Sequence, residues 1–152
     1  MINNDVLRSV RYILNINDQK MVGIFALSGA TVMPADMKNI LAQDNEPNYI
    51  ECNDQLMAHF LDGLIYFKRG KDESKPAMPF ELPITNNLIL KKLRVAFELK
   101  EDDIHDILKS ADCVIGRAEL SAFMRKKDHP NYRECGDQIM RYFLKGLKLR
   151  IR

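Results

Sequence analysis

The residues of this chain that could do chemistry occur in two matching sets. When the sequence is shifted against itself by 83 residues, Arg11 aligns with Arg94, and Asp54-Gln55 aligns with Asp137-Gln138. Each arginine lies on the apolar side of a segment with helical spacing, where an unpaired charge would be costly. We therefore expect each arginine to contact a recurring aspartate, either within its own half or exchanged between the halves. The expected repeated buried polar network comprises Arg11, Asp54, Gln55, Arg94, Asp137 and Gln138.

This expected network has two interpretations. The first is an internal strut that fixes the register of the first and fourth helices, and it is favoured because buried charges are almost always paired. The second is an anion site in which the guanidinium group holds a phosphate or carboxylate through two hydrogen bonds. Both interpretations stay open at the level of the sequence.

Cys52 and Cys135 also recur, which raises the question of a metal site. His59 follows Cys52 by seven residues, so about 10 Å of helix would separate their backbone positions. That separation does not suit two ligands of one zinc ion, and Tyr142 stands at the position that matches His59. We expect no metal and no cofactor, and we interpret the two cysteines as core thiols. A disulfide bridge between the repeats is the minor alternative.

No other pattern indicates an enzyme. The serines lack the glycines of a nucleophile elbow, and the chain has no glycine-rich phosphate loop. We therefore expect a protein without catalytic residues.

Positive charge is concentrated in the second half of the chain. Residues 1–69 have a net charge of −2, residues 70–85 of −1 and residues 86–152 of +5. One basic cluster closes an expected short helix, and a basic stripe follows one face of the last helix at steps of four, three and four residues. Together these candidate anion-binding residues are Arg125, Lys126, Lys127, Arg141, Lys145, Lys148 and Arg152.

Such groups could follow a phosphate backbone, so the sequence favours a non-catalytic protein that binds nucleic acid through its basic second repeat. The match to a helix-turn-helix is poor, because eight residues separate Leu108 from Arg117 where that motif uses three or four. The alternative is a protein-interaction or assembly module, either a homodimer whose acidic half meets its basic half or a complex with another protein.

The elements that must position these residues also repeat. Residues 3–69 and 86–152 share 19 identities in 67 positions, which indicates one supersecondary unit used twice. In the first repeat we expect a helix from Asn4 to Asn15, a second that opens at Asp18 and a third that begins near Pro34. No stretch long enough for a β-strand alternates apolar and polar residues with a period of two, so we expect no sheet.

The fourth helix of each repeat should be the longest. Asn48 and Asn131 fit a capping box, and a helix from Tyr49 to Arg69 would be roughly 30 Å long. Gly63 and Gly146 interrupt this helix at a cost near 1 kcal/mol each. Their recurrence predicts that two helix backbones approach closely there.

The expected fold class is therefore all-α, with two tandem homologous four-helix repeats related by a pseudo-twofold axis. The expected boundaries are 1–69 for the first repeat, 70–85 for a proline-rich connector and 86–152 for the basic second repeat. Apolar residues make up 46% of the chain and charged residues 29%, as in soluble globular proteins.

The chain shows neither a secretory signal nor an apolar run of membrane-spanning length. With three cysteines, an odd count, we expect reduced thiols, a cytoplasmic location and no membrane contact.

Three stretches resemble the YehS-like family of bacterial proteins of unknown function: Asn86 to Arg94, Arg69 to Ser74 and Arg133 to Gln138. The resemblance extends over essentially the whole chain and includes the two-repeat layout. It implies a small, all-helical bacterial cytoplasmic protein and supplies no activity and no catalytic residues. The first repeat departs from the pattern at Asn53, which aligns with Gly136, so a function of the second repeat need not be present in the first.

Overall fold

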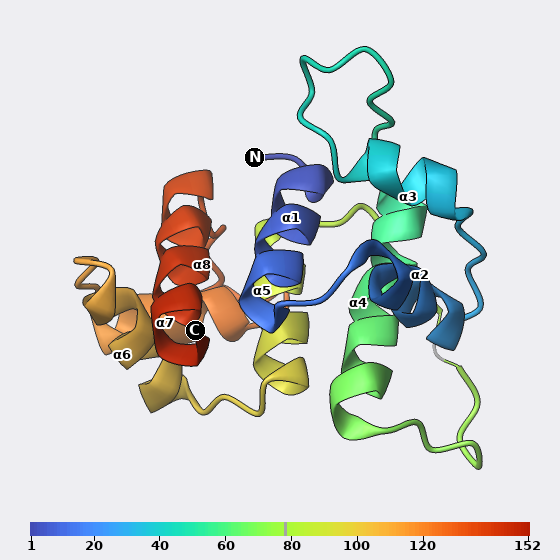
Figure 1. Cartoon of the computed structure of the whole chain (residues 1–152). Helices are drawn as coiled ribbons and strands as arrows, with labels where there is room; N and C mark the ends of the chain where they lie inside the picture. Colours follow the sequence, from blue (N-terminus) through green and yellow to red (C-terminus); the bar gives the residue numbers. More distant parts are fainter. Residues whose placement is uncertain (78) are drawn as a thin grey trace. The chain divides into compact units, whose positions relative to one another are not determined.

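The computed structural model describes residues 1–77 and 79–152, which form two compact units, Met1–Ile84 (unit 1) and Thr85–Arg152 (unit 2). All regular secondary structure in these residues is helical (Figure 1). The predicted all-α class and the two tandem repeats of four helices are confirmed. None of the helices within the described residues has the length and apolar character needed to cross a lipid bilayer.

Unit 1 contains four helices: α1 (Asn3–Leu14), α2 (Asp18–Leu27), α3 (Pro34–Ile40) and α4 (Asp54–Arg69). The second helix, α2, packs against both α3 and α4. The rings of Phe25 on α2 and Phe60 on α4 lie 5.2 Å apart between centroids, and both side chains are fully buried. Aromatic and aliphatic groups on the inner faces of these helices thus make one hydrophobic core.

Unit 2 repeats this order with α5 (Asn86–Ala96), α6 (Glu101–Ser110), α7 (Arg117–Met124) and α8 (Asp137–Ile151). In it α6 packs against α7 and α8, and α5 contacts the same two helices. The core centres on buried Phe123 and Phe143. Unit 2 therefore has a hydrophobic core of its own.

Local sequence sets several helix boundaries. The side chain of Asn17 accepts a hydrogen bond from the Lys20 N–H at 2.8 Å at the start of α2, and Thr85 accepts from the Leu88 N–H at 3.1 Å at the start of α5. These caps satisfy N–H groups that the first turn of a helix leaves open. The turn after the first helix also repeats, with left-handed φ angles of 54° at Asn15 and 55° at Glu98.

The fourth helix begins later than predicted. α4 starts at Asp54, where Asn53 accepts a hydrogen bond from the Leu56 N–H at 2.8 Å, and α8 starts at Asp137 after Gly136. The predicted capping boxes at Asn48 and Asn131 are wrong. With 16 residues, α4 is about 24 Å long.

The predicted close approach at the recurring glycines is confirmed. A Cβ atom added to Gly63 would overlap the carbonyl oxygen of Ile24 on α2, and one added to Gly146 would overlap that of Ile107 on α6. Hydrogen is therefore the only side chain that fits at these two helix contacts.

The segment between α4 and α5 is attached to unit 1. The Ile84 N–H donates to the Asp54 carboxylate at 3.1 Å, and the rings of Phe80 and His59 lie 4.7 Å apart in an edge-on arrangement. The described part of the expected connector, 70–77 and 79–85, contains no helix. These contacts hold its second half against α4.

Candidate functional site

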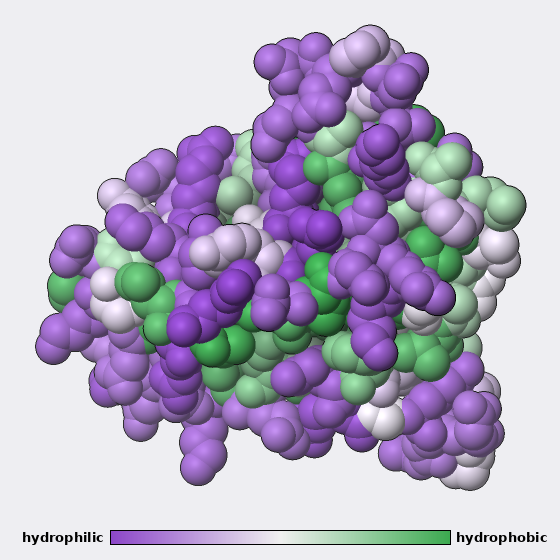
Figure 2. Space-filling view, viewed as in Figure 1, coloured by the Kyte–Doolittle hydropathy of each residue, from purple (hydrophilic) through white to green (hydrophobic). Residues whose placement is uncertain are grey.

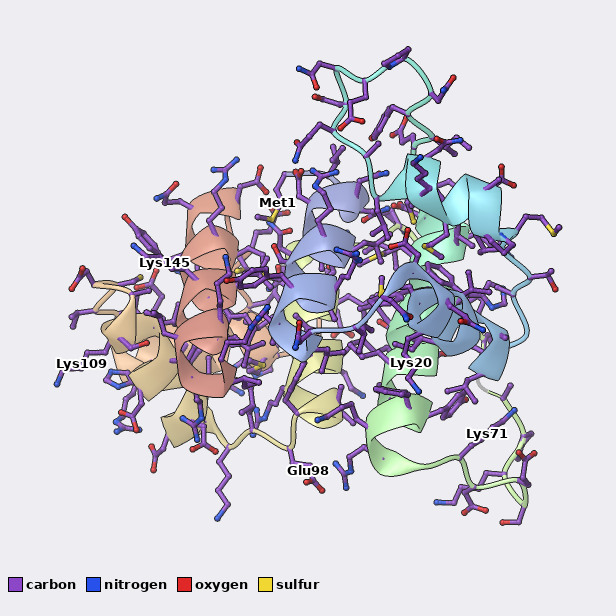
Figure 3. All side chains as sticks on the ribbon, viewed as in Figure 1. Met1, Lys20, Lys71, Glu98, Lys109 and Lys145 are labelled. Carbon is purple, nitrogen blue, oxygen red and sulfur yellow. The ribbon has the colours of Figure 1, made fainter. Side chains whose placement is uncertain are left out.

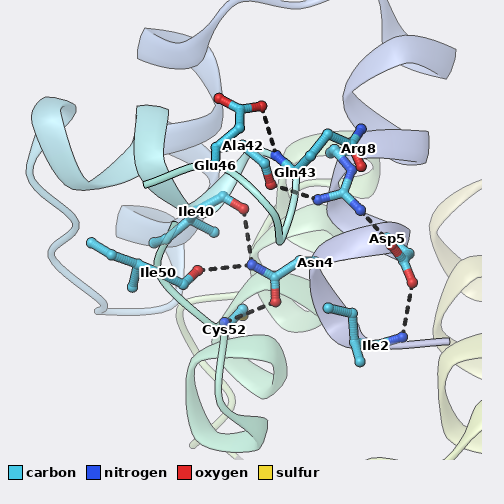
Figure 4. A network of polar contacts seen from close by, with 10 residues as sticks. All are labelled: Ile2, Asn4, Asp5, Arg8, Ile40, Ala42, Gln43, Glu46, Ile50 and Cys52. Atoms are coloured by element: carbon cyan, nitrogen blue, oxygen red, sulfur yellow. Dashed lines mark hydrogen bonds and ion pairs between the residues drawn. The ribbon is translucent and has the colours of Figure 1, made fainter. Parts of the chain in front are cut away.

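A buried asparagine ties together distant backbone segments of unit 1. Asn4 is 0% exposed, and its Nδ2 donates to the carbonyl oxygens of Ile40 and Ile50, both at 2.9 Å. Its Oδ1 accepts from the Cys52 N–H at 2.9 Å (Figure 4). We call this arrangement the amide clamp. It uses three of the four hydrogen-bonding positions of the side chain.

Unit 2 contains the same amide clamp. Asn87 donates to the carbonyl oxygens of Phe123 at 3.1 Å and Arg133 at 2.7 Å, and it accepts from the Cys135 N–H at 2.8 Å. No role for these two asparagines was expected from the sequence. The signal was the identical Asn-Asn pair that opens both repeats.

The predicted contact between the recurring arginines and aspartates is wrong. Arg11 Nε instead lies 3.1 Å from Asp18 Oδ1, and Arg94 Nε donates to the Leu99 carbonyl oxygen at 3.1 Å. Asp54 accepts from Asn3 at 2.9 Å, and Asp137 accepts from Asn86 at 2.8 Å. The aspartates thus bind asparagines of the first helix, one position before the amide clamp.

The six residues are therefore not a buried network. The side chain of Arg11 is 42% exposed, Arg94 and Asp54 are half-buried, and Gln55, Asp137 and Gln138 are exposed. The physical reason is the length of the arginine side chain, whose stem covers apolar surface while the guanidinium group reaches the flank of the helix. Neither the strut nor the enclosed anion pocket exists at these positions.

The three cysteines are free, buried thiols. Burial raises the pKa of both Cys52 and Cys135 to about 12, so both are protonated thiols at neutral pH and poor nucleophiles. They lie just before α4 and α8, not within these helices as predicted. In the described residues, no group of three or more His, Cys, Asp or Glu side chains could hold a metal ion.

The predicted basic stripe lies on the solvent side of α8. Its helical residues, Arg141, Lys145 and Lys148, are exposed, and so is Arg152 directly after the helix; Figure 3 labels Lys145. The buried residues Phe143 and Leu147 belong to the opposite, core-facing side. From first to last the basic stripe extends over roughly 16 Å.

The predicted basic cluster lies in the loop after α7. Arg125, Lys126 and Lys127 are exposed. Two of them line an open pocket of about 590 Å³, which we call the basic pocket and which is lined by Met124, Arg125, Lys126, Asp128, His129 and Pro130. Arg125 Nη1 lies 3.3 Å from His129 Nε2. No role for His129 was expected from the sequence.

The basic pocket and the basic stripe are both parts of unit 2, and they belong to different elements. The arrangement offers cationic donors to an anion and contains no nucleophile paired with a general base.

Comparison with known proteins identifies the repeated unit. Residues 3–70 and 86–152 both match the family described as protein of unknown function (DUF1456). Over 150 residues the chain is 49% identical to "Uncharacterized protein YehS" of Escherichia coli (strain K12), which covers 99% of this chain and 96% of that protein. The resemblance seen in the sequence is thereby confirmed. No solved structure matches the chain.

Proposed function

The chain belongs to the DUF1456 family of proteins of unknown function, and we propose that it is a non-catalytic cytoplasmic protein that binds nucleic acid through unit 2. The observation that supports this proposal is the contrast in charge between two units with matching helices. Unit 1 has eight Lys/Arg against eleven Asp/Glu, a net charge of −3, and unit 2 has fifteen against ten, a net charge of +5.

The basic stripe is the contact surface in this proposal. Its length of roughly 16 Å corresponds to about five steps of a nucleic-acid strand at 3.4 Å per step. Lys145 has no ion-pair partner in the part of the chain that the structure describes. A lysine without an acidic neighbour can neutralise a phosphate without first breaking an ion pair.

The experiment is a salt titration of binding to fluorescently labelled single-stranded and double-stranded oligonucleotides, followed by fluorescence anisotropy. We expect affinity at low salt that falls steeply as salt is added. The variant Lys145→Glu with Lys148→Glu should weaken binding and reduce the slope of log affinity against log salt by about 2, one for each lost phosphate contact.

The matched control is Lys38→Glu with Lys109→Glu. It makes the same change in net charge at two exposed lysines of α3 and α6, outside the basic stripe. If the control lowers affinity as much as the stripe variant does, net charge alone explains binding and the basic stripe is not the contact surface. Absence of affinity at low salt for every oligonucleotide would overturn the proposal.

The same samples test the assembly alternative, which the opposite charges of the two units favour. Sedimentation velocity would then show a dimer at low salt that dissociates as salt is added. Self-association without nucleic-acid affinity would replace the proposed function with that of an assembly module.

A further inference from the structure

Corresponding hydrogen bonds hold the loop after the third helix in both units, and we call this set of bonds the loop frame. In unit 1, Arg8 on α1 donates to the Ala42 carbonyl oxygen at 2.8 Å. In unit 2, Lys91 on α5 donates to the Arg125 carbonyl oxygen at 3.1 Å. The far end of each loop is bonded back to the third helix through the backbone. The Ile50 N–H donates to the Asn39 carbonyl oxygen at 3.1 Å, and the Arg133 N–H donates to the Ala122 carbonyl oxygen at 3.2 Å.

In unit 1, carboxylates of the protein itself accept hydrogen bonds from the donors of the loop frame. The carboxylate of Glu46 accepts from the Gln43 N–H at 3.0 Å, and the guanidinium group of Arg8 is ion-paired with Asp5 (Figure 4). The loop that contains Gln43 and Glu46 forms the hydrophilic projection at the top of Figure 2. Its cationic and N–H donors therefore already have carboxylate acceptors.

In unit 2 both carboxylates are replaced. His129 stands at the position of Glu46, and Leu88 stands at the position of Asp5. As a result, within the described residues the Lys126 N–H has no acceptor and Lys91 has no acidic partner. The loop frame of unit 2 thus keeps its cationic and N–H donors but lacks the two carboxylates that accept from them in unit 1.

The ring of His129 faces a hydrogen-bond donor at each of its two nitrogens. The Asn131 N–H lies 3.0 Å from Nδ1, and Arg125 Nη1, which can only donate, lies 3.3 Å from Nε2. A neutral imidazole accepts at only one ring nitrogen. One of these two donors therefore lacks an acceptor.

An oxygen that accepts from Arg125 and from His129 Nε2 would remove this mismatch, because Nδ1 then accepts from the Asn131 N–H. We infer that the basic pocket binds a phosphate group whose oxygens accept from Arg125 Nη1, His129 Nε2 and the Lys126 N–H. Phosphate fits because it offers several acceptor oxygens and full negative charge to arginine. Asp128 also lines the pocket, and its negative charge limits the affinity.

The inference depends on the proposed function for the source of the phosphate, which is a nucleic-acid strand. Inorganic phosphate offers the same chemistry to the pocket. The two probes can therefore be compared on the same protein.

The experiment follows the ring signals of His129 by NMR in the full chain as inorganic phosphate replaces sodium chloride at constant ionic strength. We expect a saturable shift. Arg125→Ala should weaken phosphate binding about tenfold or more, because it removes a charge-assisted hydrogen bond. The control is Lys127→Ala, which removes a charge from the same loop outside the pocket lining and should change affinity less than about twofold.

Two further variants separate binding from folding. His129→Glu introduces the carboxylate that unit 1 carries at Glu46, so it should keep the melting temperature and abolish phosphate binding. Asp128→Asn should increase phosphate affinity. The inference is overturned if phosphate leaves the His129 signals unmoved, or if Arg125→Ala and Lys127→Ala have equal effects.

A single-stranded oligonucleotide is the second probe. A shift of the His129 signals by both inorganic phosphate and the oligonucleotide supports the inference and the proposed function together. A shift by phosphate alone supports the pocket and shows that the pocket does not hold the oligonucleotide; the anisotropy titration then tests nucleic-acid binding separately. If the oligonucleotide binds while neither probe moves the His129 signals, the inference fails and the proposed function stands.

Discussion

The two units agree where a side chain meets the backbone inside the fold, and they differ in chemistry in the loop after the third helix. Asn4 and Asn87 bind corresponding backbone groups, and Gly63 and Gly146 face corresponding carbonyl oxygens. In the loop, by contrast, Glu46 is replaced by His129. Identity between the units therefore marks what the fold needs, and chemical difference marks where to look for function.

The largest expected effect is at the recurring glycines. Gly146→Ala should lower the free energy of unfolding by about 3 kcal/mol, because the added methyl group would force α8 away from α6. Gly63→Ala should act in the same way in unit 1. The control is Gly23→Ala on α2, where an added Cβ meets nothing within 4 Å; there we expect a gain of about 0.8 kcal/mol from helix propensity. Urea unfolding followed by circular dichroism measures all three, and a loss at Gly23 equal to that at Gly63 would contradict the close approach.

Substitutions in the amide clamp should destabilise the protein nearly as much as those at the recurring glycines. The effect should be equal in the two units. Asn4→Asp and Asn87→Asp keep the shape and remove the donating NH₂ group, so a carboxylate would face two carbonyl oxygens. We expect each change to destabilise the protein by about 2–3 kcal/mol, measured by thermal or urea unfolding. Asn45→Asp, at an exposed loop position, is the control and should be close to neutral. A clear inequality between the two clamp variants would show that the units are less alike than their hydrogen bonds indicate.

The loop comparison can be tested by transferring residues from unit 2 to unit 1. In a protein that carries His129→Glu, the changes Ala42→Arg, Gln43→Lys and Glu46→His should create phosphate binding in unit 1. We expect a gain of about tenfold over the His129→Glu protein, or about 1.4 kcal/mol, measured by isothermal titration calorimetry. Failure of the transfer, with folding intact, would mean that the shared loop frame is not sufficient for the site.

The smallest effect is expected at the recurring arginines. Arg11→Ala and Arg94→Ala should each cost less than about 1 kcal/mol, because exposed or half-exposed ion pairs and hydrogen bonds contribute little. Thermal unfolding measures both variants beside the clamp variants. A decrease of several kcal/mol in the free energy of unfolding would contradict the exposed position and indicate a buried, paired arginine.

The helices and their contacts were largely predictable from the sequence. The spacing of apolar residues gave four helices per repeat, and the recurring glycines gave the contact of the fourth helix with another helix. Both signals are local or periodic, so they need no knowledge of the tertiary structure. The polar residues were harder, because the flank position of Arg11 and its partner Asp18 depend on how α1 and α2 meet.

The start of the fourth helix shows the same limit more clearly. Tyr49 and Cys52 have helical spacing relative to Leu56, yet the chain before Asp54 is not helical. The Ile50 carbonyl and the Cys52 N–H bind Asn4, which lies more than 45 residues earlier. A tertiary hydrogen bond thus replaces the helical one, and no local pattern reveals it. The basic pocket was missed for a similar reason, since it depends on the proximity of Arg125 to His129 across a turn.

The amide clamp has a consequence for how each unit opens. It connects positions 48 residues apart, near the first and last helices of the unit. The first helix therefore cannot leave without freeing the segment before the fourth, so the two ends of a unit should come apart in one cooperative event. The amide hydrogens of Cys52 and Cys135 would then exchange with solvent deuterium only as slowly as their whole units unfold.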